Sequence, residues 1–339
     1  MSSSLKFLNS SAFKRRTPYW LQRLARRRVV STNAFETFYR RSVDQEIDAM
    51  GLNGTFPAPQ VVYAESTNAC NASCVMCPRD EMERGIGIMP MDLFKKIADE
   101  CAEWGVEELR LHNFGEPLID RKVYDKIEYA KRIGIPITTI YSNAALLNEE
   151  RARRLINAGL DKLYISFDGA TKKTFESIRL PLSFDQVSEN TRNFYKLRET
   201  LGSVTPQINL TFTHVSQDGT EVQKFIQDWD PYSDNVFIID AHDWAGQAEV
   251  ELQELADGQR WPCVYIWKSM TILSNGEVTL CCMDIKGRES IGNAKESSLR
   301  EIWTSMAMKR IRQAHRDHKY GKVDLCKGCS LNRMWSLYD

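Results

Sequence analysis

The stretch that decides the fold is Cys70-Asn71-Ala72-Ser73-Cys74-Val75-Met76-Cys77, in which three cysteines have the spacing C-x3-C-x2-C. It follows the β-rich apolar run Gln60–Ser66, which places the cysteines in the loop after a strand. Three thiolates bind three irons of a four-iron cluster and leave the fourth iron open. A structural zinc site is the alternative, but it requires four ligands and no fourth cysteine lies nearby. The spacing therefore favours an iron–sulfur site with one open iron.

Strand and helix patterns alternate from about residue 60 to residue 241. The expected strands are Gln60–Ser66, Glu107–His112, Ile135–Tyr141, Asp161–Phe167, Gln207–Val215 and Asn235–Asp240. The expected helices are Met91–Cys101, Lys122–Arg132, Asn148–Ala158, Phe184–Leu201 and Thr220–Asp228. Such repetition is typical of βαβ units in a parallel sheet. Six units are too few for an eight-stranded barrel, so we predict an α/β fold with a partial, open (β/α)6 barrel.

The cysteine spacing after the first strand of such a domain resembles the radical S-adenosylmethionine (SAM) superfamily. The resemblance implies that Cys70, Cys74 and Cys77 hold a [4Fe–4S] cluster whose open iron binds the amino and carboxylate groups of SAM. One electron cleaves the sulfonium, and a 5′-deoxyadenosyl radical then removes hydrogen from the substrate. Most members have an aromatic residue where this chain has Met76, and the adenine contact at that position is largely through the backbone.

Motifs at the other strand ends add to this resemblance, because ligands gather at the carboxyl ends of strands in α/β folds. Gly115-Glu116-Pro117 is similar to the family element that receives the SAM amino group, although Phe114 replaces a Gly of the closest match. The next two strand ends resemble positions that contact the ribose and the SAM carboxylate. The candidate SAM-binding residues are therefore Met76, Gly115, Glu116, Pro117, Ser142, Asn143, Ser166, Asp168 and Arg179.

Four more cysteines form a second pattern. Cys263 and Cys281 flank Ser274-Asn275-Gly276, which is a hairpin turn signal, and Cys326 and Cys329 follow. The pattern resembles the SPASM/twitch extension of radical SAM enzymes, a hairpin with a short helix, here near Leu299–His315. The resemblance implies one auxiliary [4Fe–4S] cluster filled by these four thiolates. A four-cysteine zinc site is the competitor.

Two cysteines remain outside both patterns. Cys282 could replace Cys281 as a ligand, but the spacing from the hairpin glycine favours Cys281. Cys101 lies within an expected helix, where a free cysteine mostly behaves as a small hydrophobic residue. We therefore expect both to be core or lining residues.

The auxiliary cysteine spacing resembles the twitch dehydrogenases, such as the butirosin-pathway 2-deoxy-scyllo-inosamine dehydrogenase. The resemblance implies oxidation of a hydroxylated small molecule, a sugar or aminocyclitol, with one electron passing to the auxiliary cluster. An external flavodoxin- or ferredoxin-like donor would supply the electron for SAM cleavage. A base must lie at the same strand ends, and the candidates are His214, Asp240, His242 and Asp243.

Two other functions stay open at this point. Many SPASM proteins modify a ribosomally made peptide by crosslinking, thioether formation or epimerisation, and a basic N-terminal arm could hold a leader peptide. A non-catalytic metal-binding or nucleic-acid-binding module is the third class. Lys and Arg together equal Asp and Glu at 45 each, so the charge of the chain does not favour nucleic acid as a partner.

The chain of 339 residues is long enough for about two domains. We predict a basic N-terminal extension (1–59), a radical SAM partial barrel (60–246) and an auxiliary-cluster domain (247–339). The first 28 residues contain eight Lys or Arg and no acid, and the simplest interpretation is a solvated helix. No apolar run approaches the length of a membrane span, so we expect a cytoplasmic protein.

Overall fold

The computed structural model describes residues 57–215, 219–247 and 262–329, together with five positions between residues 41 and 48. The basic stretch from Lys6 to Arg28 lies outside the described residues, as does the expected linker Gln247–Gln259 apart from its first residue. Within the described ranges, no helix is long and apolar enough to cross a membrane.

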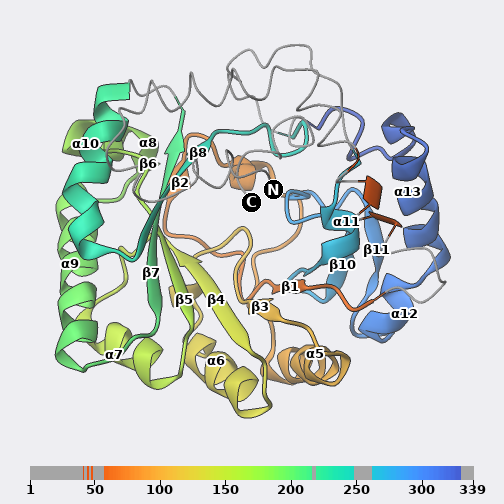
Figure 1. Cartoon of the computed structure of the whole chain (residues 1–339), viewed down its shortest axis with the longest axis horizontal. Coiled ribbons are helices and arrows are strands. Elements are labelled where there is room, and N and C mark those ends of the chain that lie inside the picture. Colours follow the sequence, from red (N-terminus) through yellow and green to blue (C-terminus); the bar gives the residue numbers. More distant parts are fainter. Residues whose placement is uncertain are drawn as a thin grey trace.

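Six parallel strands form a curved sheet with helices on its outer face (Figure 1). In spatial order the strands are β1 (Val61–Ala64), β3 (Glu108–Arg110), β4 (Ile137–Ser142), β5 (Lys162–Ser166), β7 (Gln207–His214) and β8 (Asn235–Asp240). The helices are α5 (Met91–Trp104), α6 (Val123–Arg132), α7 (Glu149–Asn157), α8 (Lys172–Ile178), α9 (Phe184–Thr200) and α10 (Gly219–Trp229). Because β8 is an edge strand of the described sheet, the barrel is open, which confirms the predicted fold class.

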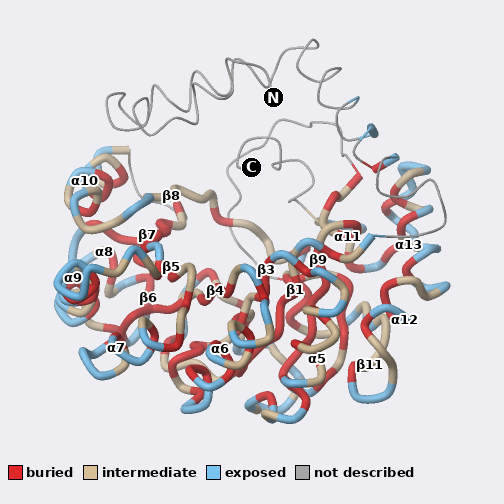
Figure 2. Tube along the Cα trace, turned by 60° about the horizontal axis from the view of Figure 1, so that its bottom comes forward, coloured by how far each residue is buried: buried red, intermediate tan, exposed pale blue. Residues whose placement is uncertain are grey.

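Alternation along the strands separates an apolar outer face from an inner face. Val62 and Ala64 of β1 are fully buried in the core under the helices, so Tyr63 between them points inward. In the same way, Leu210 and Phe212 of β7 pack outward. Figure 2 shows buried positions running through the strands and exposed positions on the outer sides of the helices. The inner face is therefore left for larger polar and aromatic side chains.

Side-chain caps start three of the helices close to the strand ends. Asn148 accepts a hydrogen bond from the amide of Arg151 at the start of α7. Thr171 and Ser183 cap α8 and α9 in the same manner. Each cap contributes about 1 kcal/mol to stability.

An aromatic cluster anchors the loop after β5. Phe167 packs against Trp229 with ring centroids 4.3 Å apart, and against Phe175 and Phe225. A Cβ on Gly169 would lie 2.4 Å from the backbone nitrogen of Phe175, so only glycine fits there. This packing fixes the strand end that carries Asp168.

The C-terminal part extends the same sheet. Strand β9 (Ser269–Ile272) pairs in parallel with β1, and β10 (Glu277–Thr279) and β11 (Ser290–Asn293) follow in antiparallel order. The antiparallel pairing of β9 with β10 confirms the predicted hairpin, and Gly276 has φ +91° in its turn. The short helix α11 (Tyr265–Lys268) precedes it.

The expected single helix at Leu299–His315 is wrong in one respect. The chain forms two helices there, α12 (Leu299–Trp303) and α13 (Met306–Arg316). The break occurs because the Ser305 side chain accepts a hydrogen bond from the amide of Met308 and starts a new helix.

Candidate functional site

The first cysteine group lies between β1 and the short helix η1 (Pro78–Glu81). Cys70, Cys74 and Cys77 are all partly exposed, and the amide of Cys77 donates to the carbonyl of Cys74 at 2.9 Å. Burial raises the pKa of Cys77 to about 11, and repulsion from Cys74 and Cys70 adds to this effect. The mutual effect on pKa indicates that the three thiols face a common space.

Groups that favour thiolates surround these sulfurs. Backbone amides of Ala72 and Arg79 lower the pKa of Cys70 and Cys77, respectively, against the larger effect of burial. A guanidinium nitrogen of Arg179 lies 3.8 Å from Sγ of Cys74. Because iron binds the thiolate form, this set of donors fits a three-thiolate cluster site.

Arg179 reaches the cysteine loop through a two-stranded pairing. Strand β2 (Ser73–Cys74) pairs with β6 (Arg179–Leu180), so Cys74 and Arg179 are register partners. Arg179 also forms an ion pair with the buried Asp168, whose backbone has φ +63°. The amide of Thr213 donates to the same carboxylate at 2.6 Å. The structure thus brings two predicted SAM-binding residues together beside a predicted cluster ligand.

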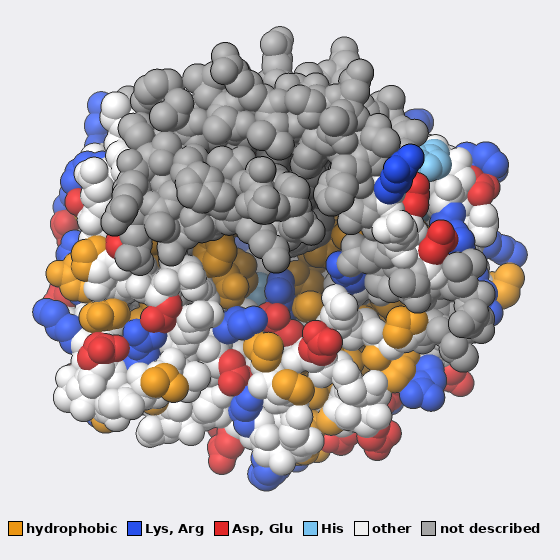
Figure 3. All heavy atoms as spheres, viewed as in Figure 1, with side chains coloured by type: hydrophobic (Ala, Val, Ile, Leu, Met, Phe, Trp, Pro, Cys, Tyr) orange, Lys and Arg blue, Asp and Glu red, His pale blue; other side chains and the backbone are white. Residues whose placement is uncertain are grey.

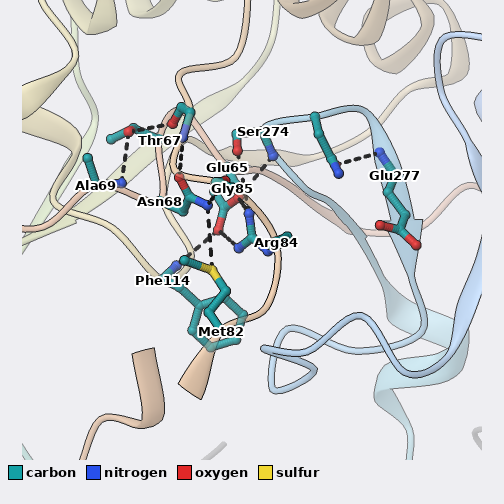
Figure 4. A network of polar contacts seen from close by, with 12 residues as sticks. Glu65, Thr67, Asn68, Ala69, Met82, Arg84, Gly85, Phe114, Ser274 and Glu277 are labelled. Atoms are coloured by element: carbon teal, nitrogen blue, oxygen red, sulfur yellow. Dashed lines mark hydrogen bonds and ion pairs between the residues drawn. The ribbon is translucent and has the colours of Figure 1, made fainter. Parts of the chain in front are cut away.

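A buried ion pair between Arg84 and Glu65 lies in the network of polar contacts drawn in Figure 4. Two nitrogens of Arg84 lie 2.7 and 2.6 Å from the carboxylate of Glu65, which directly follows β1. The amide of Ser274, in the turn of the β9–β10 hairpin, donates to the same carboxylate at 2.9 Å. Asn68 adds hydrogen bonds to the backbone of Gly85 and Gly87. This network ties the cysteine loop to the C-terminal part of the chain.

Gly115 lets the loop after β3 pack directly on the cysteine loop. A Cβ at this position would lie 2.1 Å from the carbonyl oxygen of Thr67. The next amide, of Glu116, donates to the carbonyl of Ala69 at 2.8 Å. The glycine is therefore required by the close approach of two backbones.

The Glu116 carboxylate joins several predicted SAM-binding residues. It accepts hydrogen bonds from the Ser142 hydroxyl at 2.9 Å and from the Asn143 amide at 2.7 Å. The Asn143 side chain donates to Asn71 of the cysteine loop at 2.8 Å. Pro117 follows in the short helix η2 (Pro117–Ile119). Within the structure, Glu116 holds these loops together, and its contact with SAM stays a prediction.

Trp244, which the sequence interpretation missed, lies against the predicted adenine position. Its indole nitrogen donates to the carbonyl of Met76 at 2.7 Å, and its ring centroid lies 5.5 Å from that of Phe114. Trp244 lies in the loop after β8, the sixth parallel strand. Its position just after a strand end was the feature of the sequence that could have identified it. Ser166 lies elsewhere, on the inner face of β5, 3.3 Å from the Thr211 hydroxyl.

The four predicted base candidates fall into two pairs. His214 and Asp240 are register partners on β7 and β8, with Nδ1 and Oδ1 3.8 Å apart. Alternation places His214 on the same outer face as Phe212, away from the inside of the barrel. His242 and Asp243 lie in the loop after β8, and the His242 ring packs edge-on against Trp244. Burial lowers the pKa of His242 to about 4.

The inner face carries a polar and aromatic cluster that the sequence interpretation did not identify. Arg110 of β3 donates to the hydroxyl of Tyr63 at 2.7 Å. The rings of Tyr141 and Tyr164 stack with centroids 4.3 Å apart, and His112 packs on Tyr141 at 4.4 Å. Each of the strand residues alternates with a fully buried neighbour, so period-two patterning was the signal for the cluster.

The second cysteine group is assembled from separate segments. Burial raises the pKa of Cys263 to about 12, and Cys329 adds to this rise. Backbone amides of Tyr265 and Ile266 act in the opposite direction and favour the thiolate of Cys263. A hydrogen bond with Cys282 and burial raise the pKa of Cys281, and Cys263 adds to this rise. The sulfur of Cys281 accepts a hydrogen bond from the amide of Met283 at 3.4 Å.

Exposure separates the predicted ligands from the other cysteines. All nine cysteines are described, none forms a disulfide, and the seven predicted ligands are partly exposed. Cys101 and Cys282 are buried. Among the described residues, no group of three or more His, Cys, Asp or Glu side chains is arranged to hold a single metal ion. Amide donors at Cys263 and Cys281 fit a site for thiolates.

A cavity of roughly 810 Å³ lies between the two cysteine-bearing regions, lined by Met76 and Cys77 on one side and Lys286 on the other. Lys286 also forms an ion pair with Glu81 at 2.8 Å, and Gln247 donates to the carbonyl of Met283 at 2.9 Å. Figure 3, in the view of Figure 1, shows hydrophobic side chains gathered in a hollow near the middle of the molecule, with acidic and basic side chains mixed over the surface around that hollow.

Comparison with known proteins agrees with this geometry. Residues 64–210 match the radical SAM superfamily, and residues 263–330 match the SPASM iron–sulfur cluster-binding domain. The chain is a radical SAM protein with a SPASM domain. A radical SAM domain carries a [4Fe–4S] cluster and SAM, and a SPASM domain carries auxiliary iron–sulfur clusters.

The relatives of this radical SAM protein have names that describe different activities. The chain is 24% identical over 316 residues to a tungsten-containing aldehyde ferredoxin oxidoreductase cofactor-modifying protein from Pyrococcus furiosus, and the alignment covers 80% of this chain and 87% of the relative. The solved structure of BtrN with AdoMet and 2-DOIA has a TM-score of 0.57 at 18% identity, covering 80% of this chain and 93% of BtrN. Streptococcus suis SuiB bound to its precursor peptide SuiA has a TM-score of 0.66 at 15% identity, covering 89% and 76%. These two likenesses concern the fold alone.

Proposed function

We propose that this radical SAM protein is a dehydrogenase that oxidises an alcohol of a hydroxylated small molecule, a sugar or an aminocyclitol. The observation that carries the proposal is the contact between the auxiliary cysteine loop and the inside of the barrel. A hydrogen bond with the adjacent Cys281 lowers the pKa of Cys282, and a hydrogen bond with the phenol of Tyr63, on the inner face of β1, acts in the same direction. An electron leaving a substrate in the barrel therefore has a short path toward the auxiliary site.

The cofactors would supply the radical chemistry when bound: SAM the means of removing a hydrogen atom, and the auxiliary cluster an electron acceptor. Cys70, Cys74 and Cys77 would hold the first cluster. Cys263, Cys281, Cys326 and Cys329 would hold the second. A flavodoxin- or ferredoxin-like protein would be the external donor. In this proposal the radical SAM part spans residues 60–246 and the auxiliary part residues 247–339.

The protein's own part is to orient SAM and substrate and to accept a proton. The loops joined by Glu116 and Asn143 fix the cysteine loop against the strand ends. Of the predicted bases, His242 and Asp243 lie in the loop beside Met76 and are better placed than His214 and Asp240. Burial lowers the pKa of His242, so its ring is neutral at neutral pH, and Nδ1 accepts a hydrogen bond from the backbone amide of Trp244 at 3.3 Å. This bond orients the imidazole beside Asp243.

A peptide substrate is the second candidate, and the cavity favours it. The space between Cys77 and Lys286 also has Glu83 and Arg288 in its lining, so it offers charges of both signs to a chain crossing between the two sites. Peptide modification at this place would use the same hydrogen abstraction.

The test is a reaction with deuterated substrate. Anaerobically reconstituted protein receives SAM, dithionite and 2-deoxy-scyllo-inosamine or other aminocyclitols and sugars deuterated at the carbinol carbons. We expect a ketone, and deuterium in the 5′-deoxyadenosine formed. Transfer of deuterium only from a labelled peptide, with no ketone from any hydroxylated compound, would contradict the proposal.

A further inference from the structure

One histidine inside the barrel has no role in the chemistry described so far. His112 follows β3, and the residue is 8% exposed. Its Nδ1 has no hydrogen-bond partner among the described residues. A buried polar atom without a partner destabilises the fold, and nearly all such atoms in proteins are paired. The structure therefore holds a buried hydrogen-bonding position that a ligand can complete.

The ring of His112 is oriented by its neighbours toward the inside of the barrel. Leu111 is fully buried in the core under the helices, so the adjacent His112 faces the opposite way, as Arg110 does. Its ring packs on Tyr141 at 4.4 Å and lies edge-on to Tyr63 at 5.8 Å. A hydrogen bond between the ring and the backbone of Thr139 raises the pKa of His112 against the larger effect of burial. Two flanking tyrosines thus hold the imidazole in place.

The position of His112 in the chain sets it near the SAM-binding loop. It precedes Gly115 by three residues, and Gly115 packs on the cysteine loop at Thr67. The stacked rings of Tyr141 and Tyr164 extend the inner face of the sheet from His112 toward β5. A ligand that contacts His112 therefore lies at the carboxyl end of the sheet, where substrates of this architecture bind.

The charges around His112 select the kind of group that it binds. Arg110 faces the same space, and its cation together with burial keeps the imidazole neutral by lowering its pKa to about 3. Glu108 is the nearby carboxylate, but it is paired with Arg110 at 2.8 Å. The cation of Arg110 disfavours an ammonium group. A carboxylate receives no proton from a nitrogen acceptor, and its attraction to Arg110 is reduced because Glu108 already pairs with that cation. A hydroxyl is an uncharged donor and suits both neighbours.

We propose that Nδ1 of His112 accepts a hydrogen bond from a hydroxyl group of the substrate, so that this position selects an uncharged hydroxyl over an amine or a carboxylate. The inference rests on the proposed function, because it assumes that a hydroxylated molecule enters the barrel. It assigns His112 to substrate binding, and the proton acceptor remains among the residues already named.

The experiment uses two variants that move the acceptor within one side chain. In His112→Asn the amide oxygen is separated from Cα by as many bonds as Nδ1 is in histidine. In His112→Gln the amide oxygen is separated from Cα by as many bonds as Nε2 is. Both variants and the wild type are reconstituted with clusters and S-adenosylhomocysteine, and calorimetry measures affinity for a panel of hexoses and aminocyclitols. Analogues of the best binder that each lack one hydroxyl are measured in parallel. The exposed His318→Gln is the matched control.

We expect the wild type and His318→Gln to prefer the parent over one deoxy analogue at least tenfold. His112→Asn should retain most of this preference, and His112→Gln should bind parent and analogue equally. A preference that is unchanged in His112→Gln, or lost equally in both variants, would overturn the inference while leaving ketone formation by the wild type intact. If the wild type binds and oxidises no compound of the panel, the proposed function fails, and the inference fails with it.

Discussion

The two cysteine sites of this chain are built in opposite ways. The first takes all three cysteines from eight consecutive residues, and strand pairing and backbone packing press that loop into place. The second collects Cys263 before α11, Cys281 after β10, and Cys326 and Cys329 after the short helix η4 (Tyr320–Lys322). A local loop keeps its spacing whatever happens elsewhere, whereas a dispersed site depends on the packing of every segment that contributes to it.

The two sites nevertheless share one support. Glu65 lies at the base of the cysteine loop, and its carboxylate binds both Arg84 and the hairpin turn at Ser274. The parallel pairing of β1 with β9 continues this connection through the sheet. Disturbing the local site should therefore also affect the hairpin that leads to Cys281.

The largest effect should come from removing one cysteine from each site. We expect Cys74→Ala to abolish SAM cleavage, because the cluster that binds SAM would lose one of three thiolates. Cys326→Ala should leave SAM cleavage largely intact and block substrate oxidation. Iron content, 5′-deoxyadenosine and ketone are measured for each variant, with Cys101→Ala as the control. Identical behaviour of the two variants would contradict the division of roles.

The next effect concerns the shared support. Arg84→Met leaves the buried carboxylate of Glu65 without its cation, and breaking a buried ion pair costs about 3–5 kcal/mol in the free energy of unfolding. Arg153→Met removes an exposed pair with Glu149, and we expect a change below about 0.5 kcal/mol. Urea denaturation followed by circular dichroism measures both. Equal losses in the two variants would show that the Glu65 network carries no special weight.

A smaller effect should come from the backbone contact at the local site. Gly115→Ala places a Cβ where the Thr67 carbonyl lies, and overpacking of this kind destabilises by about 1–3 kcal/mol. We also expect a loss of the iron held by the first site, with less change at the auxiliary site. The control is Gly321→Ala, because nothing lies within 4 Å of the added atom. Melting temperature and iron content per chain distinguish the two variants.

The last effect is spread over more than two pH units and is a dependence of stability on pH near the first site. His242 has a pKa of about 4 in the folded chain, against about 6.5 when unfolded. As pH falls below about 6.5, the unfolded chain takes up a proton that the folded chain does not. The free energy of unfolding should therefore fall by up to about 1.4 kcal/mol per pH unit between pH 6.5 and 4.

Urea denaturation at pH 7, 6 and 5 checks this dependence. His242→Phe should flatten the slope, and the exposed His318→Phe should leave it unchanged. A slope that is the same in wild type and His242→Phe would mean that other groups cause the loss of stability in acid.

Several features of this protein were determined by the sequence alone. The alternation of apolar runs predicted six parallel strands and an open barrel, because burial on one face imposes a period of two on a strand. The spacing C-x3-C-x2-C predicted the first cysteine group, because neighbours within one loop must lie close together. The turn signal at Ser274-Asn275-Gly276 predicted the hairpin, because the backbone at Gly276 requires positive φ.

Only the tertiary structure decided which side chains meet inside the barrel. The pairing of β1 with β3 and of β3 with β4 brings Tyr63, Arg110, His112 and Tyr141 together, although they lie in three separate segments. It also turned His214 and Asp240 to the outer face and placed Trp244 on Met76. Strand register and loop packing set these contacts, and they depend on the balance of the whole core rather than on any short stretch of sequence.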